Sequence, residues 1–290
     1  MTGSGGWWRI LDERNPRGGR LKAWLFLTHP GPSLLVTAVT VAAAGLLLHR
    51  LPSARVAVGL ALVMLPAQLA IGALNDWADV AADAASKPFK PLARGLVSRQ
   101  AAALAAVAGF AVSLATAAWL GAAPLLVALL GAGAGAAYDL GLKRGRLATL
   151  AWAGGFLAVP LLAMVVTGRL EAAPGVVPLA VLTALALQLA NGLPDVAGDR
   201  RAGIETLAVA LDRRARGAAA ALLLGAAACV AGLAIPLHQD RLVVVAVCAL
   251  ALAGAAAGLA QATRLVFPVT AVLVAIAAVS WLAALPGAAA

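Results

Sequence analysis

The sequence predicts an all-α protein that spans a membrane several times. The chain has 290 residues, of which 63% are hydrophobic and only 12% are charged, and its mean hydropathy is +0.95. Soluble domains carry roughly 25% charged residues, so this chain holds more apolar sequence than a water-soluble globule could bury. The apolar residues also fall into long runs. Most of these runs approach the ~20 residues that a helix needs to cross a bilayer core.

The apolar runs predict nine spanning helices within a single transmembrane domain, residues 24–290. The spans cover residues 24–48, 55–75, 100–120, 122–138, 148–167, 176–193, 216–236, 242–260 and 264–285. Gly and Ala recur through them, as expected where membrane helices approach each other closely. Residues 1–23 hold Trp7 and Trp8 beside Arg9 and no apolar core. We expect an interfacial segment on the cytoplasmic membrane surface there, and no cleavable signal peptide.

The basic residues predict which side of the membrane each loop faces. Nine spans place the N-terminus on the same side as the loops after the second, fourth, sixth and eighth spans. Of the 22 Lys and Arg residues, 18 lie on that side, and four lie on the other: Arg50, Arg55, Arg169 and Arg241. Because Lys and Arg concentrate in cytoplasmic loops, we expect a cytoplasmic N-terminus. The net charge of +10 is then mostly a topology signal, and it indicates no nucleic-acid partner.

Two segments carry the same polar spacing, each at the end of a long apolar run. Both have the pattern Asn-x3-Asp-x3-Asp, with Asn75, Asp79 and Asp83 in the first acidic segment (75–83), and Asn191, Asp195 and Asp199 in the second (191–199). Residues four apart lie on one face of a helix, so each trio is expected to line a single helical face. Four spans separate the segments, which puts both on the cytoplasmic side. Like charges at this spacing repel by about 0.2–0.5 kcal/mol per pair, and a bound cation would turn that repulsion into ligation.

The side chains in and around these segments indicate a magnesium and phosphate site. Carboxylate and carboxamide oxygens suit Mg²⁺, which is usually held by a few carboxylates together with substrate phosphates. Four bases near the segments could contact phosphate oxygens: Lys87, Lys90, Arg94 and Arg200. Asp76 lies one residue off the shared face, so we expect it to support the site without binding metal. Asp139 is expected to be a loop charge.

The arrangement resembles the UbiA superfamily of intramembrane prenyltransferases. The family pattern N-D-x-x-D-x-x-x-D is matched at residues 75–83, and its second pattern, D-x-x-x-D, at residues 195–199. The run K-P-x-R-P-L-x-x-G is matched at residues 87–95 with Lys90 in place of Arg, and G-D-x-x-x-G-x-x-T-L at 198–207. A family Tyr and Lys after the fourth helix are similar to Tyr138 and Lys143. The Arg-Pro pair common near the first helix is His29-Pro30 here.

The resemblance implies a nine-helix UbiA-like bundle in the cell membrane, with an active site that faces the cytoplasm. The implied reaction is the Mg²⁺-dependent transfer of an isoprenyl group from a prenyl diphosphate to a small-molecule acceptor. The implied catalytic residues are Asp79, Asp83, Asp195 and Asp199, which would bind the metal together with Asn75 and Asn191. The implied substrate-binding residues are Asn75, Lys87, Lys90, Arg94, Tyr138, Lys143, Asn191 and Arg200. Loss of the diphosphate would leave an allylic cation, which the acceptor attacks.

The acceptor is expected to be aromatic, hydroxybenzoate- or naphthoate-like, as in a quinone-type pathway. The glycine- and tyrosine-rich signature of menaquinone-pathway members is missing from the loop after the fourth span, so alternatives stay open. One is a UbiA-type terpene cyclase. Another is a prenyltransferase with a lipid or sugar-phosphate partner, for which Arg144, Arg146, Arg200 and Arg201 would be available. A divalent-cation or anion transporter is disfavoured, because transporter sites lie near the bilayer midplane and six of the spans have no charged residue in their interiors.

Overall fold

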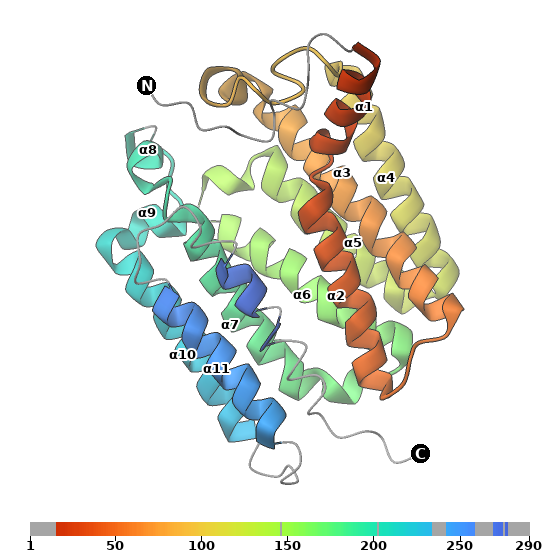
Figure 1. Cartoon of the computed structure of the whole chain (residues 1–290), viewed down its shortest axis with the longest axis vertical. Helices are drawn as coiled ribbons and strands as arrows, with labels where there is room; N and C mark the ends of the chain where they lie inside the picture. Colours follow the sequence, from red (N-terminus) through yellow and green to blue (C-terminus); the bar gives the residue numbers. More distant parts are fainter. Residues whose placement is uncertain are drawn as a thin grey trace.

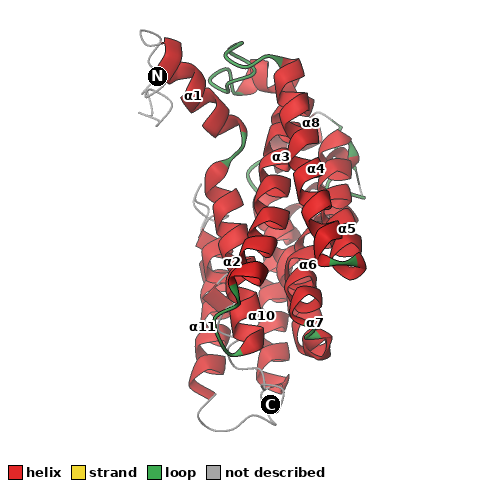
Figure 2. Cartoon of the chain, turned by 90° about the vertical axis from the view of Figure 1, so that its right-hand side faces the viewer, coloured by secondary structure: helices red, strands yellow, loops and turns green. Residues whose placement is uncertain are grey.

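The computed structural model describes residues 16–145, 147–201, 203–233, 242–258, 269–274 and 276–277. Within these ranges every regular element is a helix, which confirms the predicted all-α class (Figures 1 and 2). The long helices are α1 (Pro16–Leu27), α2 (Pro30–Leu48), α3 (Ala54–Ser86), α4 (Arg99–Leu120), α5 (Ala122–Leu140), α6 (Ala148–Thr167), α7 (Ala173–Gly192), α10 (Ala215–Leu233) and α11 (Leu242–Gly258). The short ones are η2 (Leu142–Arg144), η3 (Leu170–Ala172), α8 (Val196–Arg201), α9 (Leu207–Leu211) and η4 (Asp212–Arg214).

Six segments of the described residues are long and apolar enough to cross a membrane: 30–48, 54–84, 99–120, 122–140, 148–167 and 170–201. The predicted fifth span, 148–167, coincides with α6 residue for residue. The predicted seventh and eighth spans overlap α10 and α11. Most of the predicted ninth span and residues 1–15 of the interfacial segment lie outside the described residues. The count of nine spans and the cytoplasmic N-terminus therefore stay predictions.

The first predicted span, 24–48, is wrong as a single helix. α1 ends at Leu27 and α2 begins at Pro30, and between them His29 has φ 48° and ψ 57°, in the left-handed region. Pro30 accounts for the break, because the residue before a proline is disfavoured in the α region while proline itself suits the first turn of a helix. α1 consequently turns away from the axis of α2 (Figure 2).

The helix that contains the second predicted span, 55–75, is longer than the span itself. α3 begins after Ser53, whose side chain accepts a hydrogen bond from the Val56 amide, and continues for 33 residues to Ser86. At 1.5 Å per residue α3 is about 50 Å long, which exceeds the ~30 Å hydrocarbon core of a bilayer. The first acidic segment therefore lies on a continuous helix, as predicted.

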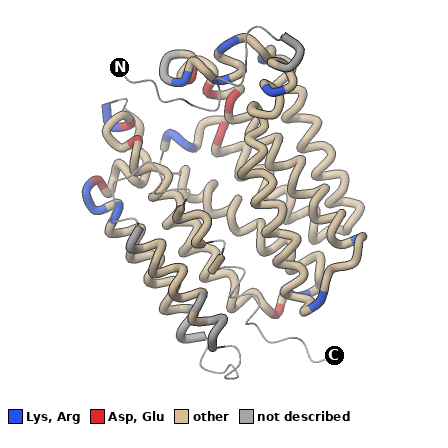
Figure 3. The backbone as a smooth tube through the Cα atoms, viewed as in Figure 1, with Lys and Arg blue, Asp and Glu red and all other residues tan. Residues whose placement is uncertain are grey.

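The long helices pack into two neighbouring groups that share one charged end. α3 packs against α2, α4 and α5, while α10 packs against α7 and α11, and α6 joins α5 to α7. The cores of both groups are rich in Ala, whose small side chain lets the helices approach closely, and Leu and Val contribute to both. Figure 3 shows most charged residues at the end of the bundle where α3 leads into α4, α5 into η2, and α7 into α8. The predicted site residues all lie on or beside these junctions.

Candidate active site

Lys90 binds two buried carboxylates of the first acidic segment. Its Nζ lies 2.7 Å from Asp76 Oδ1 and 2.6 Å from Asp83 Oδ2, and only 2% of Asp76 and 5% of Asp83 are exposed. Lys90 belongs to the α3–α4 loop, which is anchored by Leu92 and Val97 against the α3 core. Burial tends to lower the pKa of Lys90, but its hydrogen bonds and ion pairs with the two carboxylates outweigh burial and raise the pKa above the ordinary 10.5.

A second lysine, Lys143, binds Asp79 of the first acidic segment and lies near Asp139 of α5. Lys143 Nζ, in η2, lies 2.7 Å from Asp79 Oδ2 and 3.7 Å from Asp139 Oδ1. Arg144 Nη2 lies 3.9 Å from Asp79 Oδ1 and its side chain is mostly exposed. Asn75 Nδ2 donates a hydrogen bond of 2.8 Å to Asp139 Oδ1. The structure therefore brings the predicted residues Asn75, Asp79 and Lys143 together across α3, α5 and η2.

The charges of both acidic segments act on Tyr138. It lies in the last turn of α5, packed edge to face on Trp152 with ring centroids 5.6 Å apart. Its hydroxyl has electrostatic interactions with Asp79 and Asp139 and also with Asp199 of the second acidic segment. Tyr138 is therefore within electrostatic range of both acidic segments, and Lys143 contacts the first one.

The second acidic segment does not form one continuous helical face, which corrects the expectation from its spacing. α7 ends at Gly192 and α8 begins at Val196, so Asn191 closes one helix, Asp195 lies in the turn, and Asp199 lies in the next helix. Pro194 explains the interruption, because proline in a helix interior removes a backbone hydrogen bond and clashes with the preceding turn. The Asp199 amide still donates a hydrogen bond of 2.8 Å to the Asp195 carbonyl, so the two residues stay one helical turn apart.

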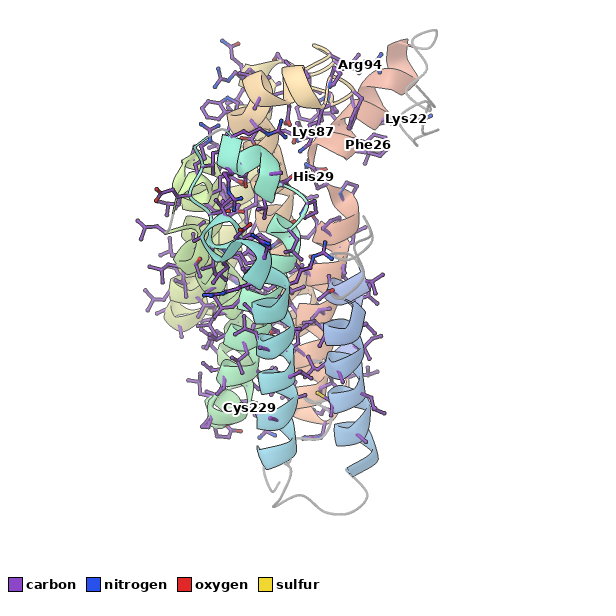
Figure 4. All side chains as sticks on the ribbon, turned by 90° about the vertical axis from the view of Figure 1, so that its left-hand side faces the viewer. Lys22, Phe26, His29, Lys87, Arg94 and Cys229 are labelled. Carbon is purple, nitrogen blue, oxygen red and sulfur yellow. The ribbon has the colours of Figure 1, made fainter. Side chains whose placement is uncertain are left out.

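The remaining predicted bases differ in their exposure and in the carboxylates that they contact. Lys87 is exposed, with its Nζ 3.9 Å from Asp83 Oδ1, and Arg200 Nη2 lies 2.8 Å from Asp212 Oδ1 in η4. Figure 4 shows Arg94 nearer the outer end of the bundle than Lys87 and His29. Arg146 lies outside the described residues.

Two further acidic residues, Asp76 and Asp139, are buried at this end of the bundle. Asp139 was expected to be a loop charge, but it lies in the last turn of α5 with 4% of its surface exposed. Asp76 is bound by Lys90 and also by His29, whose Nε2 lies 3.2 Å from Asp76 Oδ1. The only signal for Asp139 was its place between Tyr138 and Lys143, four residues before the lysine, as in a helical ion pair.

The donors at this end of the bundle suit a magnesium ion. Asp139 Oδ2 is buried without a hydrogen-bond partner, and Asp195 repels Asp199. Neither Asp195 nor Asp199 forms an ion pair with a base of the described residues. In the same part of the chain, no three Asp, Glu, His or Cys side chains converge into a ready-made metal site. A few carboxylates completed by phosphate oxygens are the usual way to hold Mg²⁺ beside a phosphate substrate.

Comparisons with known proteins bear on the family and on the fold. The sequence pattern that defines the UbiA prenyltransferase family matches residues 34–265. The digeranylgeranylglyceryl phosphate synthase of Thermococcus gammatolerans is 28% identical over 198 residues, which cover 67% of this chain and 71% of the relative.

Solved structures share the fold. The apo structure of a UbiA homolog from Aeropyrum pernix K1 has a TM-score of 0.71 and 24% identity, over 85% of this chain and 96% of that one. A UbiA homolog from Archaeoglobus fulgidus bound to GPP and Mg²⁺ has a TM-score of 0.68 and 17% identity, over 91% of this chain and 100% of that one.

Proposed function

Because the chain belongs to the UbiA prenyltransferase family, it is an integral membrane prenyltransferase, and we propose that its donor is an allylic prenyl diphosphate bound between the two acidic segments. The proposal is supported by the 2.7 Å contact of Lys143 with Asp79 and by the charges of Asp79 and Asp199, one from each segment, which both act on Tyr138. The homolog bound to GPP and Mg²⁺ supports the same donor class and the same metal. The distribution of Lys and Arg supports a cytoplasmic position for this site.

The residues that would hold Mg²⁺ are the two Asn and four Asp of the repeated spacing: Asn75, Asp79, Asp83, Asn191, Asp195 and Asp199. Bound there, the ion would neutralise the charge that develops on the departing diphosphate. Each of Asp79 and Asp83 has one lysine within 3 Å, but the Asp79 side chain is 22% exposed and that of Asp83 only 6%. We therefore propose that Asp83, the more buried of the two, contributes less than Asp79.

The side chains of this site can also assist the loss of diphosphate directly. Lys143 supplies fixed positive charge, and the Tyr138 hydroxyl supplies a hydrogen-bond donor. The bond between the first prenyl carbon and the diphosphate oxygen breaks, and its electron pair leaves with the diphosphate. The resulting allylic cation takes an electron pair from the acceptor, whose proton passes to solvent water. The apolar helices below the site would hold the prenyl chain and keep water away from the cation.

For the acceptor, we propose a glycerol lipid that carries a phosphate. The relative from Thermococcus gammatolerans is named for a product that is a glyceryl phosphate with two geranylgeranyl groups. Arg144 is the base that fits a second phosphate, because it is exposed beside Asp79 at 3.9 Å. The aromatic acceptor predicted from the sequence has no support from the relatives, so the lipid-phosphate alternative replaces it as the first choice.

The catalytic proposal is tested by replacing one aspartate in each segment. Asp79→Asn and Asp195→Asn in purified protein should each lower the rate of Mg²⁺-dependent prenyl transfer about 100-fold or more, because each removes a charge that stabilises the leaving group. Glu171→Gln, at the opposite end of the bundle where Glu171 pairs with Arg169 at 3.2 Å, is the matched control and should retain the wild-type rate. Wild-type turnover in both aspartate variants would contradict the proposal.

The acceptor proposal is tested by offering one acceptor at a time. The protein receives geranylgeranyl diphosphate and Mg²⁺ with a mono-geranylgeranyl glyceryl phosphate, with 4-hydroxybenzoate, or with no acceptor, and mass spectrometry identifies the products. We expect a second ether on the glyceryl phosphate. A prenylated aromatic would overturn the acceptor proposal and leave the transferase in place, while a hydrocarbon formed without acceptor would indicate the cyclase alternative.

A further inference from the structure

We propose that Asp139 is a positioning residue that orients the side-chain amide of Asn75 toward the metal. This inference rests on the proposed function, because it assigns a role within the same Mg²⁺ and diphosphate site. Neither the repeated spacing nor the family patterns matched at residues 75–95 and 195–207 include Asp139.

The first step is the geometry of the pair. Asn75 lies on α3, and Asp139 lies in the last turn of α5. Asn75 Nδ2 donates a hydrogen bond of 2.8 Å to Asp139 Oδ1. Asp139 is 4% exposed, and its other oxygen, Oδ2, is buried without a hydrogen-bond partner. A buried carboxylate with one oxygen unsatisfied is energetically unfavourable, so its presence at this position needs an explanation.

The second step is that the pair fixes which end of the amide faces the site. An Asn side chain presents a donor at one end and an acceptor at the other. Because Nδ2 donates to Asp139 Oδ1, Asn75 Oδ1 points to the other side. An amide oxygen is a ligand that Mg²⁺ accepts, while an amide nitrogen is not.

The third step is the position of Lys143. Its Nζ lies 2.7 Å from Asp79 Oδ2 and 3.7 Å from Asp139 Oδ1. The same ammonium group therefore links Asp139 to a carboxylate of the proposed metal site. Asp139 thus acts on the metal through Asn75. In other metal sites, carboxylates that hydrogen-bond to a ligating side chain play this role, and losing such a carboxylate lowers metal affinity about 10–100-fold.

The test measures metal binding directly. Mn²⁺ replaces Mg²⁺, and electron paramagnetic resonance gives its dissociation constant for purified protein in the presence of a non-reacting thio analogue of a prenyl diphosphate. We expect Asp139→Asn to raise that constant about 10–100-fold, because the new amide can donate to Asn75 and lets it turn. Glu171→Gln should leave the constant unchanged. Excess Mg²⁺ should restore most of the rate of Asp139→Asn, which would not happen if the variant had merely lost its fold.

A double-variant comparison separates positioning from direct ligation. If Asp139 acts through Asn75, the pair Asn75→Ala/Asp139→Asn should bind Mn²⁺ no more weakly than Asn75→Ala alone. Additive losses, or a wild-type constant for Asp139→Asn, would overturn the inference while leaving the proposed function intact. Absence of Mn²⁺ binding in the wild-type protein with the analogue would overturn both. If Asp139→Asn does not fold, Asp139→Glu moves the carboxylate by one methylene, and the same increase is expected.

Discussion

At the residue scale, the first acidic segment has its charge balanced by two lysines that come from two different loops. Lys90 approaches Asp76 and Asp83 from the α3–α4 loop, and Lys143 approaches Asp79 from η2. The helical face is thereby divided. One side is buried and bound by Lys90, while the other side, with Asn75 and Asp79, lies next to Tyr138 and Asp139. We infer that the second side handles the diphosphate and that Lys90 mainly holds the loop in place.

Lys90→Met should lower the stability of the protein. It would leave the buried Asp76 with His29 and the buried Asp83 with the more distant Lys87. Removing one member of a buried ion pair destabilises by about 3–5 kcal/mol. Because the folded-state pKa of Lys90 is raised above 10.5, its contribution is complete at neutral pH and is lost only as the pH rises through that higher value. The unfolding temperature in detergent should therefore fall by a similar amount at neutral and at mildly alkaline pH.

The control for this prediction is the neighbouring lysine. Lys87 has a 56% exposed side chain and lies 3.9 Å from Asp83, and exposed pairs contribute little to stability. Lys87→Met should therefore unfold close to the wild-type temperature. Equal unfolding temperatures for both lysine variants would mean that Lys90 does not stabilise the loop.

The sequence predicted which residue types meet at the site, but not how they pair. The spacing of Asn75 and Asp79 on a helix was visible because it depends only on local geometry. The pairing of Lys90 with Asp76 was not, because it depends on how the α3–α4 loop folds back on α3. Asp139 was missed for the same reason, since its burial results from packing between α3 and α5.

At the element scale, apolar runs predicted most helices well, but they did not detect two helix breaks next to prolines. α6 agrees residue for residue with the predicted span, and α4 begins one residue earlier than expected. The two helix breaks that the apolar runs missed fall at Pro30, where α1 and α2 separate, and at Pro194, where α7 and α8 separate. Hydropathy detects apolar length, but the local break depends on backbone sterics at single residues.

The junction between α1 and α2 depends on a glycine of α3. A Cβ on Gly72 would lie 2.9 Å from the carbonyl carbon and oxygen of Thr28 and 3.1 Å from the His29 ring. Gly72→Ala should displace the junction or separate it from α3, and overpacking of this kind destabilises by about 1–3 kcal/mol. The unfolding temperature in detergent measures the effect.

Gly133→Ala is the matched control for this change. A Cβ on Gly133, which lies in α5, meets no atom within 4 Å, and alanine favours a helix by about 1 kcal/mol over glycine. Its unfolding temperature should be unchanged or higher. A Gly72→Ala protein as stable as the wild type would show that the junction can shift without loss.

At the scale of the whole molecule, the arrangement separates charge from apolar surface along the bundle. The acidic segments and most bases lie at one end (Figure 3), while the cores of both helix groups are apolar over the rest of their length. A substrate with a charged head and a long apolar tail fits this separation. The head would stay at the loops and the tail would run between the helices, so the membrane position is part of the proposed mechanism.

The same separation predicts the orientation in the membrane, which two cysteine variants can test. Leu147, beside η2 at the acidic end, and Leu170, in η3 at the opposite end, are both 54% exposed. After Cys229 and Cys248 are replaced by Ala, a membrane-impermeant maleimide should label Leu147→Cys in inside-out vesicles and Leu170→Cys in intact cells. Because cytoplasmic loops concentrate Lys and Arg, and 18 of 22 lie on the predicted cytoplasmic side, the reverse pattern would place the site outside. A diphosphate made in the cytoplasm could then reach it only after crossing the bilayer.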